Sequence, residues 1–230
     1  MTVPQISLAF VGLVFALYLS SLAYVRFARR VPLGLVLLLA LGQMLWLGAL
    51  GWMAGSGYLL ADVTASPPAL LRSVVLPGWV AALALALLAR RGPEGADWLV
   101  SLQGLRAPLA LIFYGLYCAG ALPGHLTFVG TNFDGAIGLL ALPLGYWMHK
   151  GKAAPWLVWG FHGLGLASLL YSEAVSLLSA PTAWQCFEDA PGHGLVFRVP
   201  FVWLAGYVAP LAGLGHLLAL LPARSQVHRG

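Results

Sequence analysis

Seven long apolar segments, separated by short polar stretches, run through this 230-residue chain. Each approaches the ~20 apolar residues that a helix needs to cross the hydrocarbon core of a bilayer. The segments are continuously apolar, without the alternation typical of membrane β-barrel strands. The sequence therefore predicts an all-α, polytopic transmembrane helical bundle of about seven spans. The predicted spans are about residues 6–24, 31–54, 74–88, 98–122, 132–148, 155–178 and 199–221.

The composition agrees with a lipid environment. Hydrophobic residues make up 60% of the chain and charged residues only 8%, whereas a typical soluble domain is about 45–50% apolar and about 25% charged. Too few polar side chains are present to cover a surface in water, which excludes a soluble globule and a disordered chain. No basic stripe predicts nucleic-acid binding. We expect membrane lipids as the surroundings, and other membrane subunits or a second copy of the chain as partners.

The basic residues gather on one predicted side of the membrane. Nine of the twelve Lys and Arg residues lie on the side that the positive-inside rule assigns to the cytoplasm. With an odd number of spans, the N-terminus is then outside and the C-terminus cytoplasmic, as expected for a multi-pass protein of the bacterial inner membrane. The nine residues are Arg26, Arg29, Arg30, Arg90, Arg91, Lys150, Lys152, Arg224 and Arg229.

The polar residues within spans concentrate in the second part of the chain. We expect a single transmembrane domain in which residues 1–91 form a three-helix scaffold half and residues 92–230 form a four-helix half that carries the polar groups. An ionisable side chain at the centre of a membrane helix costs ~2.5–3.5 kcal/mol on insertion scales. Such residues therefore mark a functional site or a specific partner.

One predicted polar layer lies in the inner half of the membrane and comprises Gln103, Arg106, His162 and His216. The two histidines lie at a similar depth on different spans. They fit the axial ligands of a b-type haem, with Arg106 facing a propionate. They also fit hydrogen bonds to backbone carbonyls of neighbouring helices, or a proton relay. The sequence leaves these three interpretations open.

A second predicted layer lies near the outer ends of the spans and contains Asn132, Asp134 and Glu173. Asp134 has a structural interpretation as a helix cap, since Asp accepts hydrogen bonds from free N–H groups at a helix start. Glu173 lies within a span and needs a partner or water. No compact histidine spacing typical of a metal site is present, so we predict none. The outer loops add four further candidates, His125, Glu188, Asp189 and His193.

The chain has two cysteines, Cys118 and Cys186, and both are predicted on the outer side. That side of a bacterial inner membrane is oxidising. The two residues form either a disulfide between the long outer loop and the bundle or two unpaired thiols.

A stretch in the second half, LPGHLTFVGTNFDGAIGLLA, resembles a family of small polytopic bacterial membrane proteins. The earlier Gln103 and Arg106, and the later segments SAPTAWQCF and VPFVWLAGYVAPLAGLGHLL, extend the resemblance over about residues 100–216. The resemblance implies a helical bundle in a bacterial membrane and implies no chemistry.

Three functions fit these observations. The leading hypothesis is an intramembrane polar pocket that binds or translocates a small solute or a proton. A membrane-embedded redox or enzymatic subunit with b-type haem on His162 and His216 is the first alternative, and a structural subunit of a larger membrane complex is the second. In the leading hypothesis the ligand contacts are Gln103, Arg106, Asn132, Asp134 and Glu173, and the two histidines are relay groups.

Overall fold

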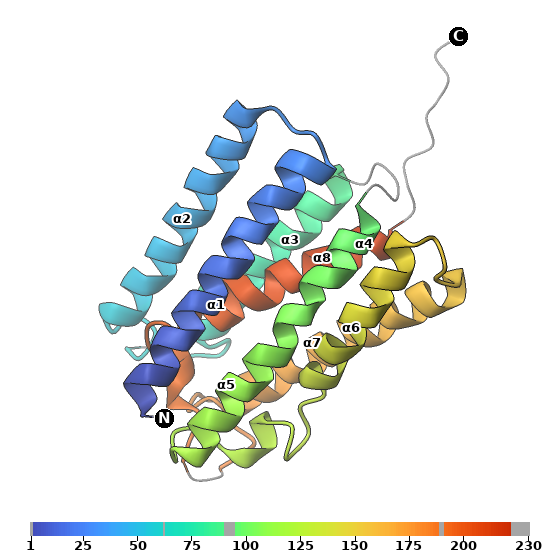
Figure 1. Cartoon of the computed structure of the whole chain (residues 1–230). Helices are drawn as coiled ribbons and strands as arrows, with labels where there is room; N and C mark the ends of the chain where they lie inside the picture. The colour runs from blue at the N-terminus through green and yellow to red at the C-terminus, as the bar shows by residue number, and fades with distance from the viewer. Residues whose placement is uncertain (1, 62, 90–94, 189–190, 222–230) are drawn as a thin grey trace.

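The computed structural model describes residues 2–61, 63–89, 95–188 and 191–221, and these form helices and turns without a strand. Seven helical segments run back and forth between the two ends of one bundle (Figure 1). The predicted all-α bundle is therefore confirmed. The segments are α1 (Val3–Ala23) with its π-helical extension Tyr24–Ala28, α2 (Leu33–Gly55), the π-helical turn Leu71–Val75 with α3 (Leu76–Ala89), α4 (Ala96–Leu102) continued through Gln103–Leu105 into α5 (Arg106–Cys118), α6 (Asp134–His149), α7 (Pro155–Ser179), and the π-helical turn Leu204–Val208 with α8 (Ala209–Leu220).

The helices differ in their capacity to cross a membrane. Five are long and apolar enough to do so, and together they indicate a multi-pass membrane protein. The helices Asp134–His149 and Leu204–Leu220 are shorter. At ~1.5 Å per residue they measure about 24–26 Å, less than the ~30 Å of a hydrocarbon core. The five full-length candidates are Val3–Ala28, Leu33–Gly55, Leu71–Ala89, Ala96–Cys118 and Pro155–Ser179.

Several predicted span boundaries differ from the structure by three to five residues, and the end of the fourth span has a clear local cause. The fourth segment ends at Cys118 rather than near Leu122. Gly120 adopts a φ of 67°, in the left-handed region that favours glycine, and Pro123 follows soon after. The helix therefore ends just before a glycine in the left-handed conformation, and a proline follows three residues later.

The alternation of the helices places five of the described basic residues at one end of the bundle. The connections after α1 and after α6 lie at the same end of the tilted bundle, toward the upper right of Figure 1, and the long loops lie at the other end. Arg29 joins two helices at that basic end, because its Nη2 donates a hydrogen bond to the carbonyl of Ala89 over 2.8 Å. The described basic residues at this end are Arg26, Arg29, Arg30, Lys150 and Lys152, whereas Arg90, Arg91, Arg224 and Arg229 lie outside the described residues.

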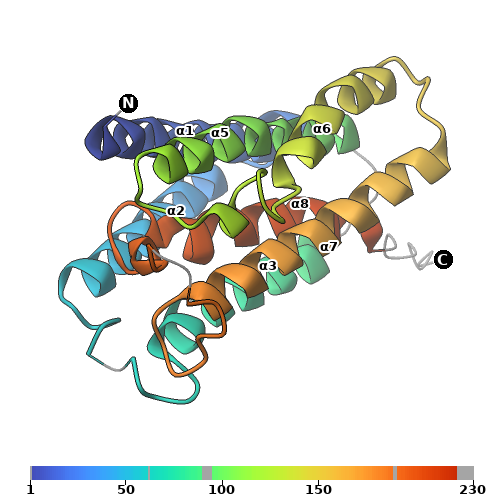
Figure 2. The same cartoon turned by 90° about the horizontal axis from the view of Figure 1, so that it is seen from below.

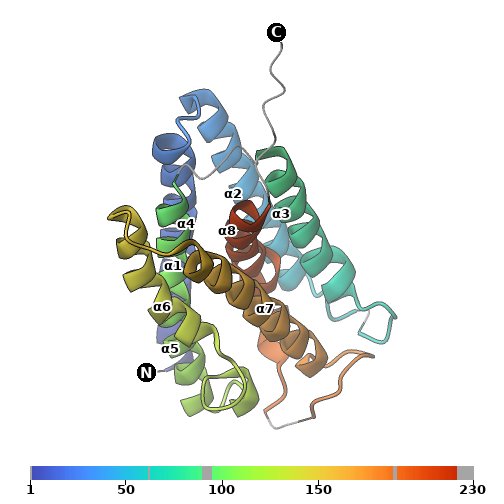
Figure 3. The same ribbon diagram turned by 90° about the vertical axis from the view of Figure 1, so that its right-hand side faces the viewer.

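Helix α8 lies in the middle of the bundle, enclosed by the other helices (Figures 2 and 3). It packs chiefly against α3 and α7, and every residue from Phe201 to Leu220 is buried or half-buried. Small residues permit this close approach. A Cβ atom at Gly213 would overlap the ring of Trp79, and one at Gly206 would lie 2.6 Å from Cδ2 of Leu50. Because protein surrounds α8, its length need not match the thickness of the bilayer.

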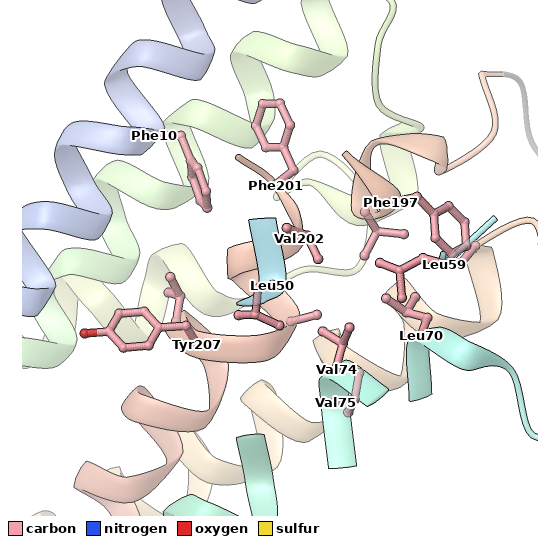
Figure 4. Close-up of a cluster of buried hydrophobic side chains, with 14 of the residues drawn as sticks. Phe10, Leu50, Leu59, Leu70, Val74, Val75, Phe197, Phe201, Val202 and Tyr207 are labelled. Atoms are coloured by element: carbon pink, nitrogen blue, oxygen red, sulfur yellow. The ribbon is translucent and has the colours of Figure 1, made fainter. Parts of the chain in front are cut away.

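One hydrophobic core joins the two predicted halves of the chain (Figure 4). Phe10 of α1 packs on Phe201, with ring centroids 5.3 Å apart. Leu50 of α2 and Val74, just before α3, enclose the backbone of Gly206. The scaffold helices therefore support the central helix directly.

The polar side chains in this scaffold region are paired with each other or with the backbone. Tyr207 donates its hydroxyl hydrogen to Oε1 of Gln43, and Ser21 contacts the same oxygen over 3.2 Å. Trp46 donates from Nε1 to the carbonyl of Gly206 over 2.7 Å. These bonds anchor α8 to α1 and α2, so the intramembrane glutamine of the scaffold has a structural role.

Candidate functional site

Arg106 begins α5 and connects four helices. Its side chain is only 4% exposed, and three of its N–H groups find acceptors on different helices. Nη1 donates to the carbonyl of Gly165 on α7 over 3.1 Å and to Nε2 of His216 on α8 over 3.2 Å. Nη2 donates to Oδ1 of Asp134 on α6, forming a buried ion pair. Arg106 of the predicted inner layer thus bonds Asp134 of the predicted outer layer, so the two layers are connected at this ion pair.

Asp134 faces this network instead of capping its own helix, so the cap interpretation is wrong. Its Oδ1 accepts hydrogen bonds from Arg106 and from the hydroxyl of Ser168, the latter over 2.7 Å. Asn132 serves the helix start instead, because its Oδ1 accepts the backbone N–H of Asp134 over 2.9 Å. A Cβ at Gly138 would overlap the backbone of Ala107, so glycine lets α6 approach α5 beside the ion pair.

His162 and His216 form a direct pair, with their Nδ1 atoms 3.1 Å apart. Because a guanidinium group only donates, Nε2 of His216 accepts from Arg106. The proton of the His216 ring then lies on Nδ1 and is donated to Nδ1 of His162, whose own proton lies on Nε2. The hydrogen-bond pattern thus assigns both rings as neutral. The Nε2–H of His162 is buried and has no partner among the described residues.

This pair does not fit two axial ligands of a haem. Two ligands on opposite sides of one iron, each at a metal–nitrogen distance of ~2.0–2.1 Å, would hold their nitrogens about 4 Å apart with the metal between them. The rings of His162 and His216 instead bond each other directly, and both nitrogens of His216 are occupied. The geometry favours a hydrogen-bonded structural pair, although its partners are side chains rather than the expected backbone carbonyls.

Gln103 lies just before α5 and contacts the central helix. Its Nε2 donates to the carbonyl of Ala212 over 3.1 Å, and its Oε1 is buried without a partner in the described part of the chain. Gly215 accommodates this contact, because a Cβ there would lie 2.9 Å from Nε2. Gln103 does not line the cavity described next.

A cavity of about 50 Å³ lies between α5, α7 and the start of the central helix, next to Asp134. The loop between α5 and α6 and the loop between α7 and the central helix complete its wall. At ~10–15 Å³ for each water position, it holds a few waters or a molecule of a few heavy atoms. Most of its wall is apolar, including Leu109, Phe113 and Phe201. Its polar wall consists of Arg106, Asn132, Asp134, Ser172, Glu173, Ser176 and His193.

Glu173 lines this cavity, and no described residue forms a hydrogen bond or an ion pair with its carboxyl group. The neighbouring Ser172 is in the same situation, because its hydroxyl oxygen is buried without a partner in the described chain. Within the described part of the chain, both side-chain hydrogen bonds of Asp134 are accepted by Oδ1. Several polar groups therefore converge on the cavity with unused hydrogen-bonding capacity.

A stripe of four serines on α7 leads from the ion pair to the loops, and sequence reasoning missed it. Ser168, Ser172, Ser176 and Ser179 follow one another at spacings of four, four and three residues, which places them on one helix face. Ser168 bonds Asp134, Ser176 contacts Nε2 of His193 over 2.8 Å, and Ser179 contacts Nε2 of His125 over 2.8 Å. The regular spacing was the signal that could have revealed this stripe.

The loops close the cavity with two histidines. His193 is 5% exposed, and its Nδ1 has no partner in the described structure. Burial, with a contribution from nearby His125, lowers the pKa of His193 to about 4, so its ring is neutral near pH 7. Ser179 donates its hydrogen to the carbonyl of Val175 and therefore accepts from Nε2–H of His125. Both histidines thus fasten the loops to α7.

Of the two remaining loop candidates, the structure describes only Glu188. Glu188 is exposed and does not line the cavity, and Asp189 lies outside the described residues. Cys118 and Cys186 are both exposed, free thiols. The disulfide alternative is therefore wrong for this structure, and the alternative of two unpaired thiols is confirmed.

Comparison with protein-family models, with curated proteins and with solved structures found no match.

Proposed function

We propose that this chain is an inner-membrane protein of a bacterium that binds a small solute or a proton in the cavity beside Glu173 and passes it across the membrane. The observation that carries this proposal is the unpaired carboxyl group of Glu173 in a cavity of a candidate membrane span. An unpaired charge in such a place is costly. It is retained where a ligand or a proton compensates it.

The surroundings of Glu173 support a route rather than an isolated pocket. The serine stripe on α7 extends from the loop histidines to the buried pair of Arg106 and Asp134. Beyond that pair lie His216 and His162, deeper in the bundle. Polar groups therefore line the bundle on both sides of Arg106, and its cationic guanidinium lies between them as a barrier.

The charge distribution supports the orientation. The described basic residues near the ends of α1 and α6 lie opposite the long loops, so the positive-inside rule assigns the cavity to the outer half of the membrane. The outward leucines of α2, such as Leu37 and Leu38, are largely exposed and fit contact with lipid.

A proton-flux assay tests the proposal. The purified protein is reconstituted into liposomes with a pH-sensitive dye inside, and a membrane potential is imposed with potassium and valinomycin. We expect proton influx above that of empty liposomes, reduced to the empty-liposome rate by Glu173→Gln. Glu188→Gln, the same substitution at an exposed loop position, is the matched control and should retain the flux.

Glu173→Asp keeps a carboxyl group and should retain part of the flux, which separates loss of function from loss of folding. Equal flux in the wild type and in Glu173→Gln would overturn the proposed role of this cavity. Absence of flux from the wild type, together with no binding of the cationic or neutral probes used below, would overturn the function as a whole.

A further inference from the structure

We propose that the solute is a small organic cation of the ammonium or methylammonium class, and that it enters the cavity in exchange for a proton on the carboxyl group of Glu173. This inference rests on the proposed function and names the ligand of the same site. It is carried by the charges and unused acceptors that line the cavity.

The charge of the wall favours a cation. The titratable and charged groups that line the cavity with Glu173 are Arg106, Asp134 and His193. Arg106 and Asp134 neutralise each other in a buried ion pair, and the ring of His193 is neutral near pH 7. Ionised Glu173 therefore leaves the cavity with one uncompensated negative charge, which attracts a cation and repels an anion.

Arg106 is poorly placed to bind an anion. The hydrogen bonds of its Nη1 and Nη2 are directed to Gly165, His216 and Asp134. Its Nε lacks a partner in the described residues. The positive charge of the guanidinium group is, however, already compensated by the carboxylate of Asp134, so Arg106 offers an anion no net charge.

The unused acceptors match the donors of an ammonium group, which presents three N–H bonds to oxygens or nitrogens. The carboxyl group of Glu173 and the buried hydroxyl oxygen of Ser172 line the cavity without partners in the described chain. The rings of Phe113 and Phe201 are part of the same wall, and aromatic faces attract organic cations.

The size and ligand set restrict the cation further. The volume of about 50 Å³ holds only a few heavy atoms at ~10–15 Å³ for each water-sized position. Among the described residues, no group of three or more His, Cys, Asp or Glu side chains is arranged to hold a metal ion. A monovalent ion with its own hydrogen-bond donors fits this wall better than a multivalent metal.

The exchange keeps the charge of the cavity constant. A half-buried carboxylate without a partner in a membrane span is costly, so Glu173 needs either a proton or a cation. When the ammonium ion enters, the O–H bond of the Glu173 carboxyl group breaks and its proton leaves for the water at the loop side. The carboxylate then pairs with the ammonium ion. One positive charge enters and one leaves.

Binding of methylammonium chloride to the detergent-purified protein tests this inference by calorimetry between about pH 6 and pH 8, with sodium chloride keeping ionic strength constant. If one proton is released for each cation bound, the apparent affinity rises about tenfold for each unit increase in pH. This dependence holds in the pH range in which Glu173 is protonated in the empty site. Repeating the titration in buffers of different ionisation enthalpy counts the released protons. Sodium acetate and methanol are the anionic and neutral probes, and neither should bind.

Three variants complete the design. Glu173→Gln should abolish methylammonium binding, and Glu188→Gln should leave it unchanged. Ser172→Ala should weaken binding roughly two- to tenfold through loss of one hydrogen bond, while the protein remains folded by size-exclusion chromatography. Binding that is independent of pH, or binding of acetate, would overturn the inference. Loss of proton flux in Glu173→Gln without methylammonium binding to the wild type would overturn this inference alone and leave the proposed function standing.

Discussion

Replacing Gly165 by alanine should destabilise the protein, although alanine is normally the better helix former. Gly165 lies within α7, and an added Cβ would lie 2.7 Å from Nε2 of His216 and closer still to Cε1. The imidazole is completely buried and cannot move without disturbing its hydrogen bond from Arg106. Gly163 lies on the same helix, and nothing would lie within 4 Å of its Cβ, so Gly163→Ala is a matched control.

The magnitude follows from the contacts. Both substitutions gain the same helix propensity, about 0.8–1.0 kcal/mol, so this gain cancels in the difference between them. Overpacking a tight site costs about 1–3 kcal/mol, and losing a hydrogen bond to a charged group costs about 1.5–3 kcal/mol. Gly165→Ala should therefore be roughly 2.5–6 kcal/mol less stable than Gly163→Ala.

Thermal unfolding in detergent measures this difference. For a chain of this size, ~1 kcal/mol corresponds to about 2–4 °C, so the two melting temperatures should differ by at least ~5 °C. A double-mutant cycle adds a second test, because His216→Ala removes the clashing ring and should make the later Gly165→Ala substitution much less costly. Equal stability of Gly165→Ala and Gly163→Ala would refute the packing of His216 against α7.

Removing one member of the buried ion pair by Asp134→Leu should lower the free energy of unfolding by about 3–5 kcal/mol, because Arg106 is left uncompensated. The double variant Arg106→Leu with Asp134→Leu should be more stable than that single variant in the same unfolding assay, and the reverse order would contradict the pairing. Since burial lowers the pKa of His193 from its usual 6.5 to about 4, unfolding takes up a proton in this range. The free energy of unfolding should therefore fall by roughly 3 kcal/mol as the pH drops from 6.5 to about 4. His193→Gln should remove this part of the pH dependence, and an unchanged slope would count against the buried neutral ring. Cys118 and Cys186 should both react with a maleimide in detergent without prior reduction, and labelling that requires a reductant would show a disulfide instead.

The solvent and the class of fold could be predicted from the sequence because they depend on local composition. A run of apolar side chains without charge excludes water, whatever its neighbours are, and only a helix satisfies its own backbone there. Arg106, Asp134 and Glu173 could be identified as costly residues for the same reason.

The partners of these residues depended on tertiary structure. Nothing local to Arg106 indicates that it reaches Asp134 on one helix and His216 on another, because rotation of each helix about its axis is set by packing. Asp134 at a helix start resembles a cap until the neighbouring helix supplies a guanidinium group. The two histidines resemble metal ligands until their rings are found to bond each other.

The identity of the enclosed helix was also beyond the sequence. The helices Leu33–Gly55 and Leu204–Leu220 have a similar apolar character, yet the first exposes most of its leucines and the second exposes no side chain beyond the half-buried level. The sequence by itself thus determined that the chain forms apolar helices long enough for a membrane. It also determined which residues are costly to place there. Only the tertiary structure, in which glycines such as Gly206 and Gly213 pack against neighbouring side chains, decided which helix lies at the centre. The physical reason is that a helix–helix contact depends on two surfaces, and these surfaces come from distant parts of the chain.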